Sequence, residues 1–461
     1  MQTQSRRHFL RTAAALSLGF TGLHTFAGCA VVRPTRPLVS DPNGLLDLPA
    51  GFRYTAFSRV GERMDDGFLV PHRHDGMAAF PGPDGLTVLV RNHEVNADAP
   101  ATEGAFHGDP SRIAALSEAQ VYDLGRQGQP ALGGTSTLVY DTRTQQLVSS
   151  HLSLAGTIRN CAGGPTPWNT WITCEETTER AGAQWRLDHG YNFEVPASAQ
   201  QGLVEAVPLK AMGRFNHEAV AVHPATSIVY QTEDRNDGLI YRFIPTTPER
   251  LHNGGRLQAL VVRDAPSLDT RNWETATVAV DERYAVEWLD IDDVDAPDDD
   301  LRLRGFEAGA ARFARGEGMW YGNEAVYFAC TNGGHNRKGQ VWKYTASPYE
   351  GTPREAEQPG TLELFIEPND VTLVENCDNL TVAPWGDLIL CEDADMDQNL
   401  VGVTPAGECY RLARNARGSS ELAGVTFSPD GSTLFVNVQH DGITLAITGP
   451  WRDVSTHAAV L

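Results

Sequence analysis

The chain has 461 residues, of which 59 are Asp or Glu and 37 are Lys or Arg, so its formal net charge is −22. A charge of this sign argues against nucleic acid or an anionic membrane as the main partner. The length is enough for a large core, and single all-β toroids reach this size.

The N-terminal residues, 1–29, have the pattern of an export signal. The segment SRRHFLR (5–11) precedes a short, weakly apolar run (12–27), which predicts a twin-arginine signal peptide and a periplasmic or extracellular location. The segment FAGC, which ends at Cys29, resembles a lipoprotein processing site, so a lipid anchor at Cys29 is an open alternative. We expect the twin-arginine export machinery to be a partner, and residues 30–461 to form one monomeric domain.

Short alternating strands fill most of the remaining chain, and one hairpin pattern occurs six times. Each copy begins with a polar residue and ends, after two strands, in a polar pair. The first residues are Asp75, Cys161, Glu218, Glu317, Asp378 and Glu421, and the terminal pairs are His93-Glu94, Glu175-Glu176, Glu233-Asp234, Thr331-Asn332, Glu392-Asp393 and Gln439-His440. The pattern predicts an all-β, six-bladed β-propeller with inter-blade insertions, and a two-sheet sandwich is the alternative. The clearest helix candidate is 110–124.

The two polar ends of each hairpin should meet, because the start of the first strand lies beside the end of the second. If these are the inner strands of six blades, the polar groups converge at one mouth of a central channel. The expected ring contains Glu94, Cys161, Glu175, Glu218, Glu233, Glu317, Asp378 and Glu392. Crowded, buried carboxylates raise one another's pKa, and bound cations would relieve this. A set of solvated acids remains the alternative.

The cysteines fall into two kinds by position. Cys174, Cys330 and Cys391 each precede the terminal pair of a hairpin, where they are expected to pack as small hydrophobic residues. Cys161 instead takes a position that holds a carboxylate in the other copies. Oxygen ligands suit calcium or magnesium, and one thiolate among them indicates a transition metal such as iron or zinc. A disulfide with Cys174, or a plain buried thiol, stays open for Cys161.

Arg315 lies two residues before Glu317, a spacing that puts both side chains on one face of a strand. A guanidinium beside a metal-bound carboxylate could receive an anionic substrate. A purely structural salt bridge is the alternative.

Several motifs together resemble the PhoX-type alkaline phosphatases. They are the twin-arginine leader, NCAGGPTPWNTWITCEE, GRFNHEAVAV, YQTEDR, RGEG, CDNLTVAPWGDLILCED and ELAGVTFSPDGSTLFVNVQHDGITLAITGPW, which extend from about residue 70 to 452. The resemblance implies a propeller that holds a calcium–iron cluster and hydrolyses small phosphate esters outside the cytoplasm. The chain departs from the pattern at Thr331, which replaces an acid, and it is shorter than better-studied members.

By motif position, the resemblance implies a role for each ring residue. Cys161 would be the thiolate ligand of iron, and Arg315 would contact the phosphate. The carboxylate ligands would be Glu218, Glu317 and Asp378, completed by Glu175, Glu233 and Glu392. Two rival functions remain: a calcium-dependent propeller lactonase or esterase, and a non-catalytic exported propeller that binds a ligand and is stabilised by metal.

Overall fold

The structure is a computed structural model that describes residues 37–114, 116–126 and 128–454. The predicted export signal and Cys29 lie outside the described residues. Strands dominate, and the described α-helices are short: α2 (Pro110–Ile113) and α3 (Leu301–Glu307). None of the helices in this part of the chain is long and apolar enough to cross a membrane.

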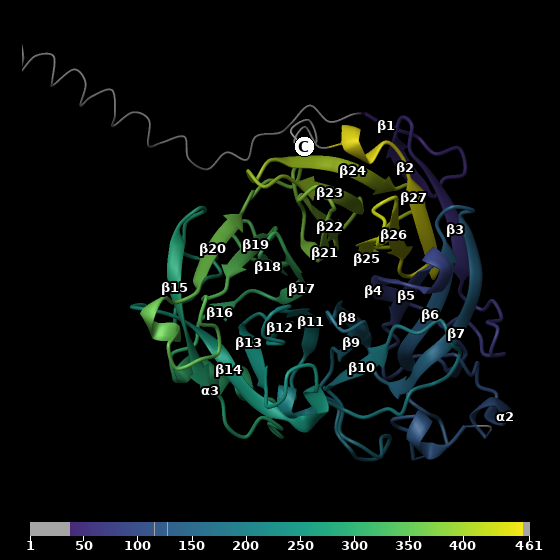
Figure 1. Cartoon of the computed structure of the whole chain (residues 1–461), viewed down its shortest axis with the longest axis horizontal. Coiled ribbons are helices and arrows are strands. Elements are labelled where there is room, and N and C mark those ends of the chain that lie inside the picture. The colour runs from purple at the N-terminus through teal and green to yellow at the C-terminus, as the bar shows by residue number, and fades with distance from the viewer. Residues whose placement is uncertain (1–36, 115, 127, 455–461) are drawn as a thin grey trace, which may run out of the picture.

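Six strands surround the centre of the molecule (Figure 1). They are β4 (His74–Pro81), β8 (Asn160–Pro165), β11 (His217–Val222), β17 (Gly316–Gly322), β21 (Cys377–Val382) and β25 (Leu422–Phe427). Each contacts the next, and β25 contacts β4, so the six inner strands form a closed ring. The arrangement is therefore propeller-like, as the repeat predicts.

Each inner strand pairs antiparallel with the strand that follows it, which gives the six predicted hairpins. The partners are β5 (Thr87–His93), β9 (Thr170–Glu175), β12 (Val229–Glu233), β18 (Ala325–Cys330), β22 (Leu388–Glu392) and β26 (Thr433–Val438). We call the end of the ring where the inner strands begin and their partners end the mouth.

The outer strands extend the hairpins away from the centre. They are β6 (Gly133–Asp141), β7 (Gln146–Thr157), β10 (Asn192–Pro196), β13 (Gly238–Pro245), β14 (Gly255–Val262), β19 (Gln340–Thr345), β20 (Thr361–Ile366), β23 (Asn399–Val403), β24 (Cys409–Asn415) and β27 (Ile443–Thr448). N-terminal strands complete two C-terminal sheets: β3 (Arg53–Arg59) pairs with β27, and β2 (Leu46–Pro49) pairs with β24 and with β1 (Leu38–Val39). These pairings tie the two ends of the described chain together.

The strand pairing differs from six separate blades, because the described strands form five sheets. An inserted strand, β15 (Arg283–Asp290), pairs with both β14 and β20 and so joins the third and fourth hairpins in one ten-stranded sheet. The short strand β16 (Arg312–Phe313) pairs with β13 at the same sheet. The structure thus shows an all-β, propeller-like arrangement in which two neighbouring units share an outer edge.

The helix expected over 110–124 is mostly absent. Among the described residues of this segment, the only helical turns are α2 and a 3-10 turn, Glu118–Gln120. Its apolar residues Ile113, Leu116 and Val121 pack in one cluster with Leu152 from β7. Tertiary packing on the neighbouring strands, rather than helical periodicity, therefore explains the apolar pattern.

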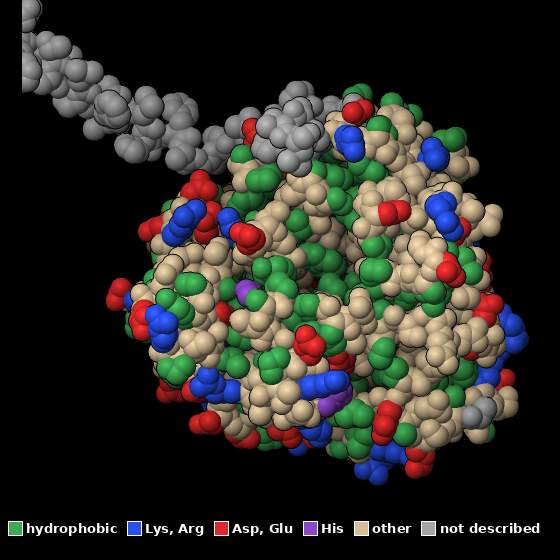
Figure 2. All heavy atoms as spheres, viewed as in Figure 1, with side chains coloured by type: hydrophobic (Ala, Val, Ile, Leu, Met, Phe, Trp, Pro, Cys, Tyr) green, Lys and Arg blue, Asp and Glu red, His purple; other side chains and the backbone are tan. Residues whose placement is uncertain are grey.

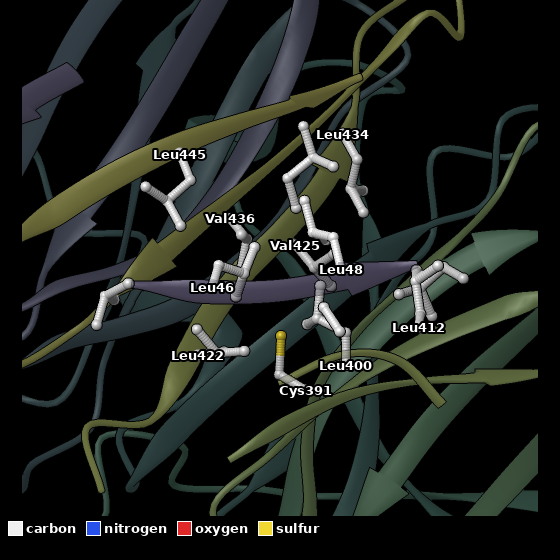
Figure 3. Close-up of a cluster of buried hydrophobic side chains, with 14 of the residues drawn as sticks. Leu46, Leu48, Cys391, Leu400, Leu412, Leu422, Val425, Leu434, Val436 and Leu445 are labelled. Atoms are coloured by element: carbon white, nitrogen blue, oxygen red, sulfur yellow. The ribbon is translucent and has the colours of Figure 1, made fainter. Parts of the chain in front are cut away.

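Apolar side chains fill the spaces between neighbouring sheets. Figure 3 shows one such cluster, in which the Cys391 thiol points among Leu400, Leu422 and Leu46. Cys330 and Cys174 lie in two further clusters, and all six described cysteines are free. The expectation that these three cysteines pack as small hydrophobic residues is confirmed. On the face seen in Figure 2 the centre is hollowed, and most charged side chains in view lie towards the outer edge.

Candidate metal centre

A β-bulge lies at the mouth end of every hairpin. The register between the two strands shifts at the start of each inner strand. In five hairpins the shift includes the polar first residue, namely Asp75, Cys161, Glu218, Glu317 or Asp378. A bulge redirects a side chain out of the regular alternation. These first residues are all buried or half-buried.

The structure brings four of the predicted ligands into two groups that share Glu218. The ligand atoms of Cys161, Glu176 and Glu218 lie within 4.8 Å of one another, and so do those of Glu218, Glu317 and Asp378. One group offers a thiol and two carboxylates, and the other offers three carboxylates. This donor set fits a transition metal in the first group and a hard cation such as calcium in the second.

Glu175 does not join these groups, although the sequence predicts it as a ligand. Its Oε1 accepts hydrogen bonds from Ile158 N (2.8 Å) and His189 Nδ1 (2.6 Å), and its Oε2 accepts them from Gly190 N (2.8 Å) and Tyr191 N (3.2 Å). Because β9 ends at Glu175, the next residue, Glu176, leaves the strand and turns to the ring instead. The prediction is displaced by one residue.

Glu233 and Glu392 show the same displacement. Glu233 accepts hydrogen bonds from Leu239 N and from Tyr241 Oη (2.8 Å), both on β13. Glu392 accepts them from Glu375 N (2.8 Å) and Asn399 Nδ2 (2.6 Å). Both carboxylates therefore serve the hydrogen-bonding of their own sheets, and neither belongs to the two ligand groups.

The residues that follow these strands were missed as ring members. They are Glu176, Asp234 and Asp393, each the second residue of a terminal pair, and their backbone N–H groups donate to carbonyls at the starts of inner strands. The signal was present in the sequence, since each pair contains two acids. Alternation alone could not show which of the two leaves the strand.

Burial and mutual repulsion disfavour the charged forms of the ring carboxylates. Burial, followed by the charges of Asp378 and other neighbours, raises the pKa of Glu218 well above its ordinary value. Burial and then Asp393 raise the pKa of Asp378 to about 8. Burial and then Glu218 raise the pKa of the Cys161 thiol. Bound cations would reverse these shifts, because they favour deprotonated ligands.

Two arginines lie against the ligand groups. Arg315 donates from Nε to Asp234 Oδ1 (2.8 Å) and from Nη2 to Glu317 Oε1 (2.7 Å), so the predicted common face of Arg315 and Glu317 is confirmed. Arg159, which the sequence did not single out, donates from Nε to Glu94 Oε1 (3.0 Å) and lies 2.9 Å from Glu176 through Nη2.

A neutral amide holds a further set of acids on the opposite side of the ring. Gln439 Nε2 lies 2.8 Å from Asp75 Oδ2, 2.8 Å from Glu94 Oε2 and 3.0 Å from Glu421 Oε1. The carboxylates of the ring are therefore linked partly by cationic and partly by neutral donors.

The family model of alkaline phosphatase PhoX matches residues 34–442 of the chain. Among solved structures, PhoX of Pseudomonas fluorescens in complex with vanadate, a transition state analogue, is similar in fold, with a TM-score of 0.66, 18% sequence identity, and coverage of 93% of this chain and 100% of that chain. A gluconolactonase from Xanthomonas campestris has a TM-score of 0.41 at 12% identity, covering 91% of this chain and 99% of its own. No curated protein sequence matches the chain.

The displacement from Glu175 to Glu176 can be tested with a matched pair of variants. We expect Glu176→Gln to weaken metal binding about tenfold or more, because it removes a charge from a group of three ligands. Glu175→Gln should change metal affinity far less. It should lower the free energy of unfolding by about 3–5 kcal/mol, since it leaves the buried His189 without its close carboxylate partner. Metal titration and denaturant unfolding measure the two effects, and the reverse ranking of metal affinities would contradict the assignment.

The metal-free protein should lose stability as the pH rises. The pKa of Asp378 is raised to about 8, and those of Glu233 and Glu392 to about 7, all mainly by burial. The native state therefore holds protons that the unfolded chain, with carboxyl pKa values of about 4, releases. The free energy of unfolding should fall between about pH 4 and pH 8. The pKa of His189 is raised to about 9 by its carboxylate neighbours against the effect of burial, so its contribution is present below about pH 6.5 and lost as the pH passes 9.

Thermal midpoints of chelator-treated protein between pH 5 and 9 check this. Added calcium should reduce the slope, because the cation replaces the protons. A metal-free midpoint that rises over the same range would show that the ring carboxylates ionise without cost.

Proposed function

The chain belongs to the alkaline phosphatase PhoX family, and from this premise we propose that it is an exported, metal-dependent phosphomonoesterase with a calcium–iron cluster at the mouth. The observation that carries the proposal is the pair of ligand groups sharing Glu218, with one thiol among carboxylates and Arg315 alongside. We also interpret the ring as a six-bladed propeller in which β15 joins two adjacent blades.

The donor set suggests how the metals would be divided. Cys161, Glu176 and Glu218 would hold iron, because a thiolate favours a transition metal. Glu218, Glu317 and Asp378 would hold calcium, which prefers oxygen ligands. When bound, these cations would offset the charge of a phosphate ester and lower the pKa of a water molecule. The raised pKa values of the ligands fit this role. Carboxylates crowded together in a buried group are stabilised either by taking up protons or by binding a cation.

Arg315 would bind and orient the phosphate. Its guanidinium is fixed by Asp234 and Glu317, and its side chain remains 32% exposed. Its Nε and Nη2 donate to Asp234 and Glu317, so Nη1, with its two N–H groups, would donate to the phosphate oxygens. The guanidinium stays charged at any working pH. Asp234 and Glu317 thus hold Arg315 in one orientation before the substrate arrives, which lowers the entropy cost of binding.

Export and anchoring rest on residues 1–29. We propose that the twin-arginine pattern directs the chain to the periplasm or the cell exterior. In the alternative form of this proposal, the exported protein is anchored to a membrane by a lipid attached to Cys29. Changing both Arg6 and Arg7 to Lys should retain the protein in the cytoplasm, as cell fractionation would show. Normal export of that variant would contradict the signal.

A combined metal and activity measurement tests the proposed function. Protein isolated from its native host should contain calcium and iron, absorb visible light through thiolate-to-iron charge transfer, and hydrolyse p-nitrophenyl phosphate. Colourless protein that is fully active with calcium alone would favour the lactonase or esterase hypothesis, in which Cys161 is not needed. A protein that binds metal but hydrolyses neither phosphate esters nor lactones and carboxylic esters would favour a non-catalytic binding propeller.

Two variants separate the metal from the substrate. Glu317→Gln should lower metal content and activity together, because it removes a ligand charge. Arg315→Ala should keep the metal, since loss of a cation cannot weaken cation binding electrostatically, and it should lower kcat/KM by about 10- to 150-fold. If Arg315→Ala loses metal as readily as Glu317→Gln, Arg315 has only a structural role.

A further inference from the structure

A repeated backbone position at the mouth carries three arginines. Arg73, Arg159 and Arg315 each lie two residues before the first residue of a hairpin, and each has a left-handed backbone, with φ of 53°, 52° and 50°. Such values are uncommon outside glycine and persist where the surroundings fix them, often at functional sites. The carbonyl of each arginine accepts a hydrogen bond from the end of its own hairpin, at Glu94 N, Glu176 N and Thr331 N respectively.

Arg159 and Arg315 make equivalent contacts from this position. Arg315 links Asp234, at the end of the preceding hairpin, to Glu317 of one ligand group. Arg159 links Glu94, at the end of its own preceding hairpin, to Glu176 of the other ligand group. Since the two groups share Glu218, one arginine flanks each side of a continuous set of ligands.

The exposure of Arg159 differs from that of the three most buried arginines among the described residues. Arg91, Arg214 and Arg242 are at most 1% exposed. The side chain of Arg159 is 39% exposed, close to the 32% of Arg315. In both Arg159 and Arg315, Nη1 has no hydrogen-bond partner among the described residues. Each guanidinium therefore keeps donors that an incoming molecule can use.

Arg159 is not the only donor to Glu94. Glu94 also lies within 2.8 Å of the Gln439 amide, which holds two further carboxylates without a charge of its own. An oxyanion is bound well by a cation that has free N–H donors, and Arg159 provides such a cation beside a ligand group.

We propose that Arg159 is a second substrate-binding arginine, which acts with Arg315 on a phosphate held between the two ligand groups. The inference rests on the proposed phosphatase function. A phosphate ester has three non-bridging oxygens, so two guanidinium groups on different sides can contact different oxygens. This would fix the rotation of the phosphate and stabilise charge that spreads over those oxygens in the transition state.

The test compares Arg159→Ala, Arg159→Lys and, as a matched control, Arg73→Ala. Arg73 has the same repeat position and backbone, but its only described ion pair is a 4.0 Å contact with Glu103, and it touches neither ligand group. Metal content, inhibition by inorganic phosphate, and kcat/KM for p-nitrophenyl phosphate are measured for each variant.

Arg159→Ala should retain metal and weaken phosphate inhibition and kcat/KM by about 10- to 150-fold. Arg159→Lys should give an intermediate loss, because it keeps the charge without the planar fork. Arg73→Ala should stay within about threefold of wild type, the range of ordinary surface substitutions. If Arg159→Ala does not fold, Arg159→Gln replaces it in the same measurements.

Unchanged phosphate inhibition and kcat/KM in Arg159→Ala would overturn the inference. Loss of metal from Arg159→Ala equal to that from Glu176→Gln would also overturn it, because the arginine would then serve the ligands only. A wild-type protein without phosphatase turnover or phosphate inhibition would defeat the proposed function itself. An active wild type that is impaired by Arg315→Ala but not by Arg159→Ala would defeat this inference alone.

Discussion

The rest of the structure depends on one electrostatic constraint, the crowding of carboxylates at the buried mouth of the ring. Glu218 is 3% exposed and lies in both ligand groups, so it cannot ionise without facing other acids. Protons, cations or fixed donors must offset that repulsion. The structure supplies Arg159, Arg315 and the Gln439 amide, and the remaining charge is what a metal cluster would balance.

The backbone holds these acids together by close contact between inner strands. A β-carbon at Gly318 would lie 2.6 Å from the carbonyl oxygen of Asp378, and one at Gly76 would lie 2.6 Å from Ala162 Cα. Only glycine allows neighbouring hairpins to approach so closely at these points. The close approach and the bulges bring the first residues of different hairpins within reach of one ion. Strand pairing in the rest of each sheet keeps these acidic ends from moving apart.

Much of this could be predicted from the sequence, because the repeat fixes position. Copies that differ in length by at most one residue place Cys161, Glu218, Glu317 and Asp378 at equivalent points, and the hydrophobic setting of Cys391 follows from strand alternation. The structure departs from the expected ring where alternation stops. Glu175 ends its strand and is held by His189, so Glu176 faces the ring, and no local pattern shows where pairing ends. The joining strand β15 was missed because its pairing with β20 is set by tertiary contacts.

Equivalent positions of the repeat therefore carry different chemistry around the ring. Two residues before the first residue, the second and fourth hairpins have Arg159 and Arg315, whereas the third has Asn216. Asn216 Nδ2 donates to Glu176 Oε1 at 3.0 Å, so it orients that carboxylate without adding charge. The third hairpin thus contributes Glu218 with no cation of its own, between two hairpins that do carry one. Glu218 therefore lies between two ligand-group neighbours, Glu176 and Glu317, that are each paired with an arginine.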